Sequence, residues 1–350
     1  MSDNEDFKRE AWQFFTITNP FFVSAFYEWF SLIPDESKKI LLEPFAWANN
    51  IISLIDELTL FEDWSKCKRK CFDIDTSYEN KAPEFEIIKQ DTIKNYPIWY
   101  DVVITNPPYL AKNSATRRWL SYDYPEYEDL YQKCLEVMLM HTKFVAAIIP
   151  ESFITSWLFT NRLYSVVSLT CKMFDDTDCP VCLALFVSPE VKENEFKNEI
   201  NNFYMYRMDK KIWDYYSISE SILTLFWEKE NIDWVFNDKD WDIGIICIDS
   251  TKKPTIEFIK WNWISPDRIK VSSRSLTRVS WLPNWINLDE FLSICNEKLQ
   301  KYREISNDIC LTSFKWLRDD WLYRRRLDFK TAKMIMNSAI FTIKSKQWVL

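Results

Sequence analysis

Four consecutive residues, Asn106, Pro107, Pro108 and Tyr109, combine the side chains and the backbone stiffness needed to hold a flat aminated ring. Each proline fixes its own φ at about −65° and removes a backbone donor, and it also keeps the preceding residue extended. The amide of Asn106 and the free carbonyl groups can accept hydrogen bonds from an amino group, and Tyr109 offers an aromatic face. We therefore predict that this tetrapeptide binds a planar aminated substrate such as adenine.

The tetrapeptide follows the apolar run at residues 100–105, which predicts a buried strand. Apolar runs of similar length predict further strands at residues 39–44, 70–74, 85–91, 144–150 and 182–187. Stretches at residues 51–58 and 127–142 predict intervening helices. Strands that alternate with helices are typical of an open α/β sheet. A charged, polar stretch near residue 195 predicts the end of this α/β domain, residues 1–195.

Acidic residues follow three of the predicted strands. Glu43 closes the first strand and precedes Pro44, Asp73 closes the second, and Asp91 follows the third. Ligands of open α/β sheets collect at the carboxyl ends of the strands, where an acid after the second strand can accept both ribose hydroxyls of a nucleoside cofactor. A single acid at such a place more often caps a helix or forms a turn. The order and spacing of the whole set indicate a nucleoside-cofactor site.

Taken together, these motifs resemble those of the S-adenosylmethionine-dependent adenine-N6 DNA methyltransferases over roughly residues 8–190. In that family NPPY is the catalytic motif, and a Glu/Asp-Pro-x-x-Gly loop follows the first strand. A Gly-Gln-Phe-Phe-Thr motif before the first strand corresponds here to Trp12-Gln13-Phe14-Phe15-Thr16. Its position ahead of the catalytic motif resembles the gamma-type motif order of restriction-modification enzymes, whose target-recognition domain is C-terminal.

The resemblance implies a Rossmann-like class I methyltransferase sheet of the α/β class that binds S-adenosyl-L-methionine. It implies that Asp73 holds the ribose of this cofactor and Asp91 its adenine. The residues that it assigns to the methionine end are Thr16, Glu43, Pro44, Ala46 and Trp47.

The resemblance also implies a mechanism. The target adenine is flipped out of the duplex, because its N6 cannot be reached in the stack. Tyr109 then stacks on the extruded ring, while the Asn106 side chain and the Pro107 carbonyl group accept hydrogen bonds from the N6 amino group. Positioning supplies much of the rate in such a site, and no metal or histidine base is required.

The charge of the chain is unevenly distributed. The formal net charge is −8, yet residues 260–350 carry 17 Lys and Arg against 9 Asp and Glu. Affinity for nucleic acid depends on local phosphate neutralisation rather than on total charge. We predict that residues 196–350 form a target-recognition domain for double-stranded DNA. The basic patch predicted to contact the DNA, unless it is an ordinary solvated helix face, comprises Arg318, Arg324, Arg325 and Arg326.

Further features of the sequence argue against a zinc protein, a secreted protein and a membrane protein. A single histidine, His141, and one CxxC pair, Cys179 and Cys182, are too few ligands for a zinc site, so no metal is expected. Irregularly spaced cysteines are typical of a reduced cytoplasmic protein. No run resembles a signal peptide or is long enough to cross a membrane. We expect a cytoplasmic monomer, with a cognate restriction endonuclease as a candidate partner.

The chain has one glycine, Gly244, and 18 tryptophans. Average usage of about 7% predicts roughly 25 glycines. Trp12 and Trp47 stand where the family has glycine. Asx-Gly is the usual turn dipeptide, but tryptophan takes the place of glycine in six Asx-Trp pairs: Asp63-Trp64, Asp233-Trp234, Asp240-Trp241, Asn262-Trp263, Asn284-Trp285 and Asp320-Trp321. Our hypothesis is that many of these tryptophans represent glycine encoded by UGA, which the codons would test. A true tryptophan at 47 is expected to weaken cofactor binding.

Two alternatives remain open at this level. Protein-glutamine and RNA methyltransferases also use NPPY for planar amides or amines, but they do not predict the Gln-Phe-Phe-Thr motif together with a basic C-terminal module. The second alternative is a DNA-binding relative without catalysis, in which Trp47 blocks the cofactor loop.

Overall fold

The structure is a computed structural model that describes residues 16–58, 67–175, 177–237, 242–269, 274–279 and 282–347. The chain divides into two compact units, Met1–Asp214 and Tyr215–Leu350. Trp12, Trp64 and Trp241, which the sequence analysis singled out, lie outside the described residues. In the described part of the chain, no helix has the length and apolar character required to cross a membrane.

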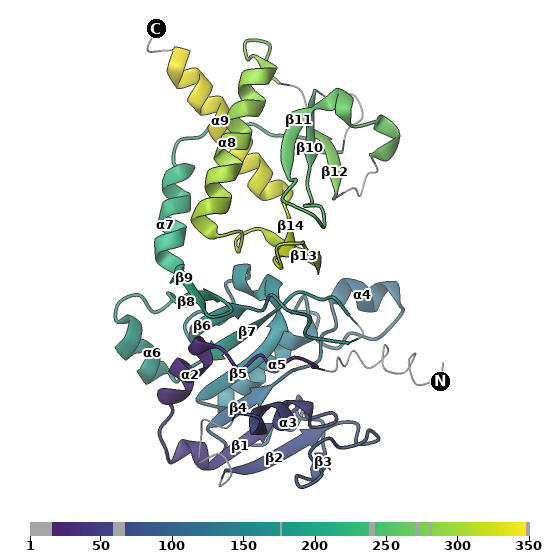
Figure 1. The fold of residues 1–350 in the computed structure, drawn as a ribbon, viewed down its shortest axis with the longest axis vertical. Helices are drawn as coiled ribbons and strands as arrows, with labels where there is room; N and C mark the ends of the chain where they lie inside the picture. Colours follow the sequence, from purple (N-terminus) through teal and green to yellow (C-terminus); the bar gives the residue numbers. More distant parts are fainter. Residues whose placement is uncertain are drawn as a thin grey trace. The chain divides into compact units, whose positions relative to one another are not determined.

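The first unit is built around a nine-stranded sheet with the spatial order β3-β2-β1-β4-β5-β7-β6-β8-β9 (Figure 1). The strands are β1 (Ile40–Glu43), β2 (Lys68–Asp73), β3 (Ile87–Lys89), β4 (Val102–Thr105), β5 (Phe144–Pro150), β6 (Leu163–Ser168), β7 (Val181–Phe186), β8 (Tyr204–Arg207) and β9 (Lys210–Asp214). The neighbours from β3 to β5 pair in parallel, as do β6 and β8, whereas β7 runs antiparallel to both β5 and β6. The predicted α/β class with a mostly parallel sheet is confirmed.

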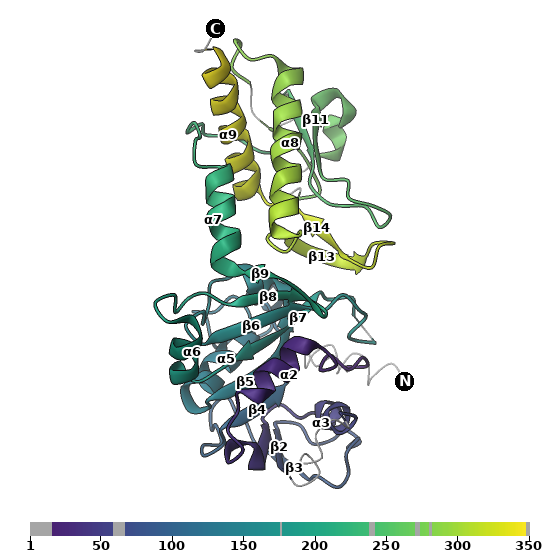
Figure 2. The same ribbon diagram turned by 60° about the vertical axis from the view of Figure 1, so that its left-hand side comes forward.

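Helices of the first unit connect and cover the strands (Figure 2). They are α2 (Ser24–Ser31), η1 (Ser37–Lys39), α3 (Asn50–Asp56), α4 (Lys112–Arg117), α5 (Leu130–His141), η3 (Glu151–Thr155) and α6 (Pro189–Phe196). The central strands β4 to β7 are buried along nearly their whole length, as their continuous apolar sequences require in a sheet covered on both faces. This buried centre holds the strand ends that carry the NPPY tetrapeptide.

The first unit extends further than the sequence predicted. The charged stretch near residue 195 forms α6, whose N-terminus is capped by the Ser188 side chain accepting from the backbone N–H of Val191 at 3.3 Å. Strands β8 and β9 follow and join the sheet through β6. The predicted boundary at residue 195 is therefore too early, because pairing with β6 holds the chain in the first unit up to Asp214.

In its described residues, the second unit contains two small sheets, three α-helices and two short 3-10 helices. A three-stranded antiparallel sheet has the order β11-β10-β12, and a hairpin is formed by β13 and β14. The elements are α7 (Tyr215–Leu225), β10 (Ile243–Ile246), β11 (Glu257–Lys260), η4 (Trp261–Trp263), η5 (Pro266–Arg268), β12 (Leu276–Val279), α8 (Leu288–Ser306), β13 (Thr312–Leu317), β14 (Tyr323–Arg326) and α9 (Phe329–Gln347). Helices α8 and α9 pack side by side over an apolar core that includes Trp234 (Figures 1 and 2).

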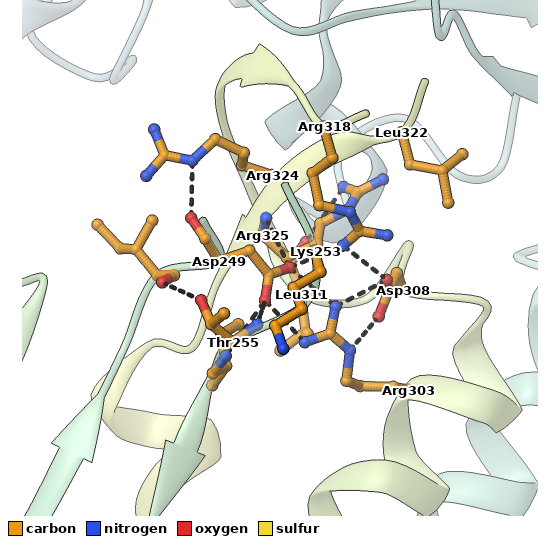
Figure 3. A network of polar contacts seen from close by, with 12 residues as sticks. Asp249, Lys253, Thr255, Arg303, Asp308, Leu311, Arg318, Leu322, Arg324 and Arg325 are labelled. Carbon is orange, nitrogen blue, oxygen red and sulfur yellow. Dashed lines mark hydrogen bonds and ion pairs between the residues drawn. The ribbon is translucent and has the colours of Figure 1, made fainter. Parts of the chain in front are cut away.

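A buried ionic network joins the parts of the second unit, and its centre is Asp249 (Figure 3). Arg303 of α8 donates to both carboxylate oxygens of Asp249, at 3.0 and 2.8 Å, and Arg318 donates to Oδ2 at 2.8 Å. Asp308 and Asp320 accept from the same two arginines, so two guanidinium groups lie among three carboxylates. The Asp249 side chain is fully buried, and the network therefore ties α8 to the β13–β14 hairpin inside the unit.

The charge of Asp249 depends on these arginines. Burial acts to raise the pKa of Asp249, but the hydrogen bonds and charge of Arg303 outweigh it and hold that pKa below its ordinary value. A depressed pKa in the folded state adds stability at pH values above the unfolded pKa of about 3.9, and this contribution is lost as the pH falls through the folded value.

We expect Asp249→Asn to destabilise the second unit by about 3–5 kcal/mol, because a buried ion pair loses one partner and the new amide NH2 group faces N–H donors of Arg303 or Arg318. Denaturant unfolding, with amide hydrogen exchange in α8 as the local readout, measures the effect. Asp320→Asn is the matched control, since Asp320 pairs with the same Arg318 but is 46% exposed and should cost less than about 1 kcal/mol. Equal losses in the two variants would contradict the prediction. The difference between parent and Asp249→Asn should shrink below about pH 4.

Candidate functional site

A cavity of about 760 Å³ opens in the first unit at the carboxyl edge of the sheet. Residues from four consecutive strand ends line it: 45–48 after β1, 73–75 after β2, 89–94 around the end of β3, and 106–108 after β4. Its volume lies within the range of about 300–1,000 Å³ that is usual for small-molecule and cofactor sites. The parallel arrangement of β1 to β4 brings these segments together, because their carboxyl ends meet at one edge.

Asp73 joins the first two of these loops. Its Oδ2 accepts the backbone N–H of Trp47 at 2.8 Å, and its Oδ1 accepts that of Asp75 at 2.8 Å. The carboxylate is buried at the cavity wall, and burial raises the pKa of Asp73 even though both N–H groups act to lower it. Each carboxylate oxygen keeps a second lone pair, so the group can still accept hydrogen bonds from a ligand.

In the loop after β1, some residues line the cavity and others support the loop from inside the protein. Ala46 and Trp47 line the cavity, and their role in cofactor binding stays a prediction. Glu43 and Pro44 do not: Glu43 is fully buried, and the carbonyl oxygen of Pro44 accepts the Thr92 hydroxyl at 2.7 Å behind the loop. The predicted direct role of these two residues is thus replaced by one in shaping the loop, because both point into the protein.

Glu43 connects β1 to β4, the strand that precedes the NPPY tetrapeptide. Its Oε1 accepts the hydroxyl of Thr105, the residue before Asn106, at 2.5 Å and the backbone N–H of Phe45 at 3.1 Å. Its Oε2 is buried without a hydrogen-bond partner in the described part of the chain. Burial raises the pKa of Glu43 to about 8, so the carboxyl group is mostly protonated at neutral pH.

Asn106 is held from two sides at the cavity wall. Its Nδ2 donates to the hydroxyl oxygen of Thr16 at 3.3 Å, and its Oδ1 lies 2.5 Å from the donating hydroxyl of Tyr109. Thr16 is buried and forms an isolated β-bridge with Phe174. The structure thus brings the predicted N-terminal motif residue to the NPPY tetrapeptide and orients the Asn106 amide.

Tyr109 does not lie where the resemblance implied. Its side chain is 5% exposed and is absent from the cavity lining, and its ring lies edge-on to Tyr131 and Phe174. Its hydroxyl is also 2.6 Å from the carbonyl oxygen of Ile148 in β5, and burial raises the pKa of Tyr109 well above its ordinary value. In this conformation the single hydroxyl proton of Tyr109 can be donated to either Asn106 or Ile148, and the ring does not face the cavity.

Asp91 lines the cavity after β3 and also caps the turn that follows. Its Oδ1 accepts the backbone N–H groups of Ile93 and Lys94 at 3.2 Å each, and the Lys94 ammonium group lies 3.3 Å from Oδ2. The sequence analysis missed Asp123 and Tyr124, which line the opposite wall ahead of α5. Their only signal was a stretch rich in tyrosine and acid downstream of NPPY.

Only two of the four arginines in the predicted DNA-contacting patch are partly exposed. The guanidinium groups of Arg318 and Arg325 are buried, and Arg318 pairs with Asp249 and Asp320, so these two residues do not form the exposed patch that the sequence predicted (Figure 3). Arg324 is half-buried and donates to the carbonyl oxygen of Asp249 at 2.7 Å. Arg326 is half-buried as well, and desolvation lowers its pKa. Carboxylates bind Arg318 inside the unit and the Leu311 carbonyl oxygen accepts from Arg325, and the charge count alone cannot reveal these partners.

The segment that forms most of the cavity is similar to a known protein family. Residues 38–177 match the family model described as Eco57I restriction-modification methylase. This segment includes β1 to β5, the acids Asp73 and Asp91, and the NPPY tetrapeptide. No curated protein matches the chain.

Among solved structures, a putative class I S-adenosylmethionine-dependent methyltransferase from Listeria monocytogenes is 15% identical with a TM-score of 0.35, and the match covers 49% of this chain and 62% of that one. The methyltransferase subunit of a type I restriction-modification system from Streptococcus thermophilus is 15% identical with a TM-score of 0.38, over 66% of this chain and 57% of that one. A modification subunit of a putative type I restriction enzyme from Vibrio vulnificus YJ016 is 11% identical with a TM-score of 0.33, over 58% and 50%. The matches span 50–62% of the length of these three proteins.

We expect Glu43→Gln to remove a pH-dependent loss of stability. The unfolded carboxyl releases its proton above about pH 4.3. The folded carboxyl retains its proton up to about pH 8, so the parent protein is destabilised as the pH rises between these values. Between pH 5 and pH 8, thermal unfolding should show the free energy of unfolding of the variant rising by a few kcal/mol relative to that of the parent, since one unit of pKa corresponds to about 1.4 kcal/mol. Glu84→Gln, at an exposed site, is the control and should give a pH-independent difference.

Proposed function

We propose that the protein is a site-specific DNA methyltransferase that transfers a methyl group from S-adenosyl-L-methionine to N6 of an adenine flipped out of double-stranded DNA. The observation that carries the proposal is the single cavity that joins Asp73 and Asp91 to the wall formed by Asn106, Pro107 and Pro108. The match of residues 38–177 to a restriction-modification methylase family supports methyl transfer to DNA as the reaction class.

The residues of the cavity fit the cofactor. Asp73 lies at the end of β2 with one free lone pair on each oxygen, which suits two ribose hydroxyls, and Asp91 can accept from the cofactor's adenine amino group. The segment 46–48 and Thr16 border the remaining part of the cavity, where the methionine end would lie. When bound, the cofactor would supply the methyl sulfonium group that is the electrophile.

The catalytic wall acts by orientation. Nδ2 of Asn106 donates to Thr16 and its Oδ1 accepts from the Tyr109 hydroxyl, so the amide is held at both ends, and a carbonyl oxygen can accept more than one hydrogen bond. That oxygen and the Pro107 carbonyl group can accept both N6 hydrogens of an adenine, which orients the nitrogen lone pair for attack. Since Pro107 and Pro108 lack backbone donors and are conformationally restricted, the acceptors stay in place.

In this proposal the second unit binds the DNA. Arg324 and Arg326 of β14 are the members of the predicted patch that are not fully buried, and the hairpin that carries them is braced by the Asp249 network. Phosphate contacts of this kind position a protein on a duplex without reading its sequence. In this proposal the second unit binds the duplex while the first unit receives the flipped adenine.

Asn106→Ala should reduce the methylation rate of plasmid DNA by about 10²–10³-fold, as expected when a group that stabilises the transition state is removed. Cofactor and DNA binding should be retained. Asn113→Ala, an exposed asparagine on the neighbouring helix α4, is the matched control and should be fully active. Mapping of the modified bases completes the experiment. Methylation of cytosine, RNA or protein glutamine in place of DNA adenine, or an active Asn106→Ala variant, would refute the proposal.

Tyr109→Phe tests whether the tyrosine acts through its hydroxyl group. The variant keeps the ring but removes the donor to Asn106, so we expect kcat to fall by about 2–10-fold, the value of one ordinary hydrogen bond, with little change in KM for DNA. Steady-state kinetics on one methylation site measures both quantities. An unchanged kcat would show that the hydroxyl contributes nothing and that only the ring is used.

A further inference from the structure

Six tryptophans adopt a backbone conformation that favours glycine. They have left-handed φ angles, and they are Trp47 (46°), Trp99 (83°), Trp119 (58°), Trp157 (63°), Trp316 (68°) and Trp321 (61°). A bulky L-residue is rarely found in this region, because its Cβ atom crowds the following carbonyl oxygen, whereas glycine has no Cβ atom. Asparagine and aspartate tolerate the region, and four of the other left-handed residues are of these types: Asn49, Asn237, Asn307 and Asp308.

Five of these tryptophans have exposed side chains, so burial does not offset the backbone strain there, whereas Trp47 is buried. The exposed fractions are 90% for Trp99, 95% for Trp119 and 72% for Trp321, and Trp157 and Trp316 are also exposed. Large indoles normally stabilise a protein by being buried. The Trp316 ring does lie near the Arg324 guanidinium group, at 5.6 Å, but Phe314 lies nearer to the same group, at 5.1 Å.

Two other tryptophans have a buried side chain and an ordinary backbone conformation. Trp29 is fully buried in α2 and its indole N–H donates to the carbonyl oxygen of Phe186 at 2.8 Å. Trp234 is buried in the core of the second unit and donates to Oδ1 of Asn337 at 2.7 Å. Neither has a left-handed φ. The interpretation of Asp233-Trp234 as an Asx-Gly turn is therefore wrong, whereas Asp320-Trp321, in the turn between β13 and β14, has the backbone of one.

We propose that glycine, not tryptophan, occupies positions 47, 99, 119, 157, 316 and 321 in the protein as its organism makes it, and that Trp29 and Trp234 are true tryptophans. A gene in which UGA encodes glycine and UGG encodes tryptophan gives this mixture when every UGA is translated as tryptophan. The same reading accounts for a 350-residue chain with one glycine.

The assignment changes the candidate cofactor site at Trp47, a consequence that rests on the proposed function. The backbone N–H of residue 47 binds Asp73, and the buried indole forms part of the cavity wall, edge-on to Tyr78 at 5.1 Å between ring centroids. Glycine would keep the left-handed turn and the N–H donor, while it removes the indole from the wall. The loop backbone then becomes accessible to a ligand, as it is where glycine-rich turns bind nucleotide cofactors.

The nucleotide sequence provides the first test. We expect UGA at the six left-handed positions and UGG at Trp29 and Trp234, and peptide mass spectrometry of the protein from its source should show glycine at the six. UGG codons at the six positions, or tryptophan in the peptides that contain them, would overturn the proposal.

Paired substitutions provide a second test in the recombinant chain. At Trp99, Trp119 and Trp321, glycine should raise the thermal unfolding midpoint by about 2–4 °C per site relative to alanine, because alanine retains a Cβ atom. Trp29→Gly and Trp234→Gly should instead lower the midpoint. Equal midpoints for the glycine and alanine variants would show that removal of an exposed indole, rather than relief of the backbone, explains any gain, and would count against the proposal.

Calorimetric titration of S-adenosyl-L-methionine separates this inference from the proposed function. Trp47→Gly should bind on the order of tenfold tighter than the parent chain, and Trp47→Ala should bind less tightly than Trp47→Gly. If the codons and the unfolding midpoints agree with glycine but no variant binds the cofactor, the proposed function fails and the glycine assignment stands. If Trp47→Gly binds no better than the parent while Asn106 is required for methylation, the inferred effect on the cavity is wrong.

Discussion

The orientation of one side-chain amide depends on three distant parts of the first unit. Asn106, at the end of β4, donates to Thr16 and accepts from Tyr109, whose hydroxyl also lies against the Ile148 carbonyl oxygen in β5. These groups meet because β4 and β5 are parallel neighbours whose carboxyl ends share one edge of the sheet. The amide can therefore keep this orientation only when the sheet, the N-terminal segment and the NPPY tetrapeptide are all in place.

Two buried acids show how neighbouring charge decides the state of a carboxyl group. Glu43 lies in the sheet with a threonine hydroxyl and one backbone N–H as donors, and burial keeps its pKa high. Asp249 is as deeply buried, but two arginines contact it and its pKa stays low. A neutral carboxyl group can link β1 to β4 without a counter-ion, whereas a buried carboxylate needs basic side chains as partners. The second case explains why part of the C-terminal arginine cluster lies inside its unit.

Backbone strain is concentrated at tryptophans. A left-handed conformation costs a residue with a side chain roughly 1–2 kcal/mol, and six tryptophans in the described ranges adopt it. Native proteins are stable by only about 5–15 kcal/mol in total, so strain at this many sites is large on that scale. The same conformation in glycine carries no such cost. Loops of the cavity in the first unit and of the β13–β14 hairpin thus have the geometry of glycine-containing turns, although the side chains there are indoles.

The sequence by itself determined the central strands, the two main helices between them, the acids at three strand ends and the position of NPPY, because apolar periodicity and proline chemistry are local properties. It did not predict β6, β8 and β9 or the end of the first unit at Asp214, since sheet extension depends on a partner strand elsewhere in the chain. Only the tertiary structure decided that Tyr109 turns inward, that Glu43 supports rather than lines the cavity, and that Arg318 pairs with Asp249. Each of these outcomes depends on which polar groups, far apart in the chain, become neighbours once the apolar core excludes water, and buried polar groups must then find partners among them.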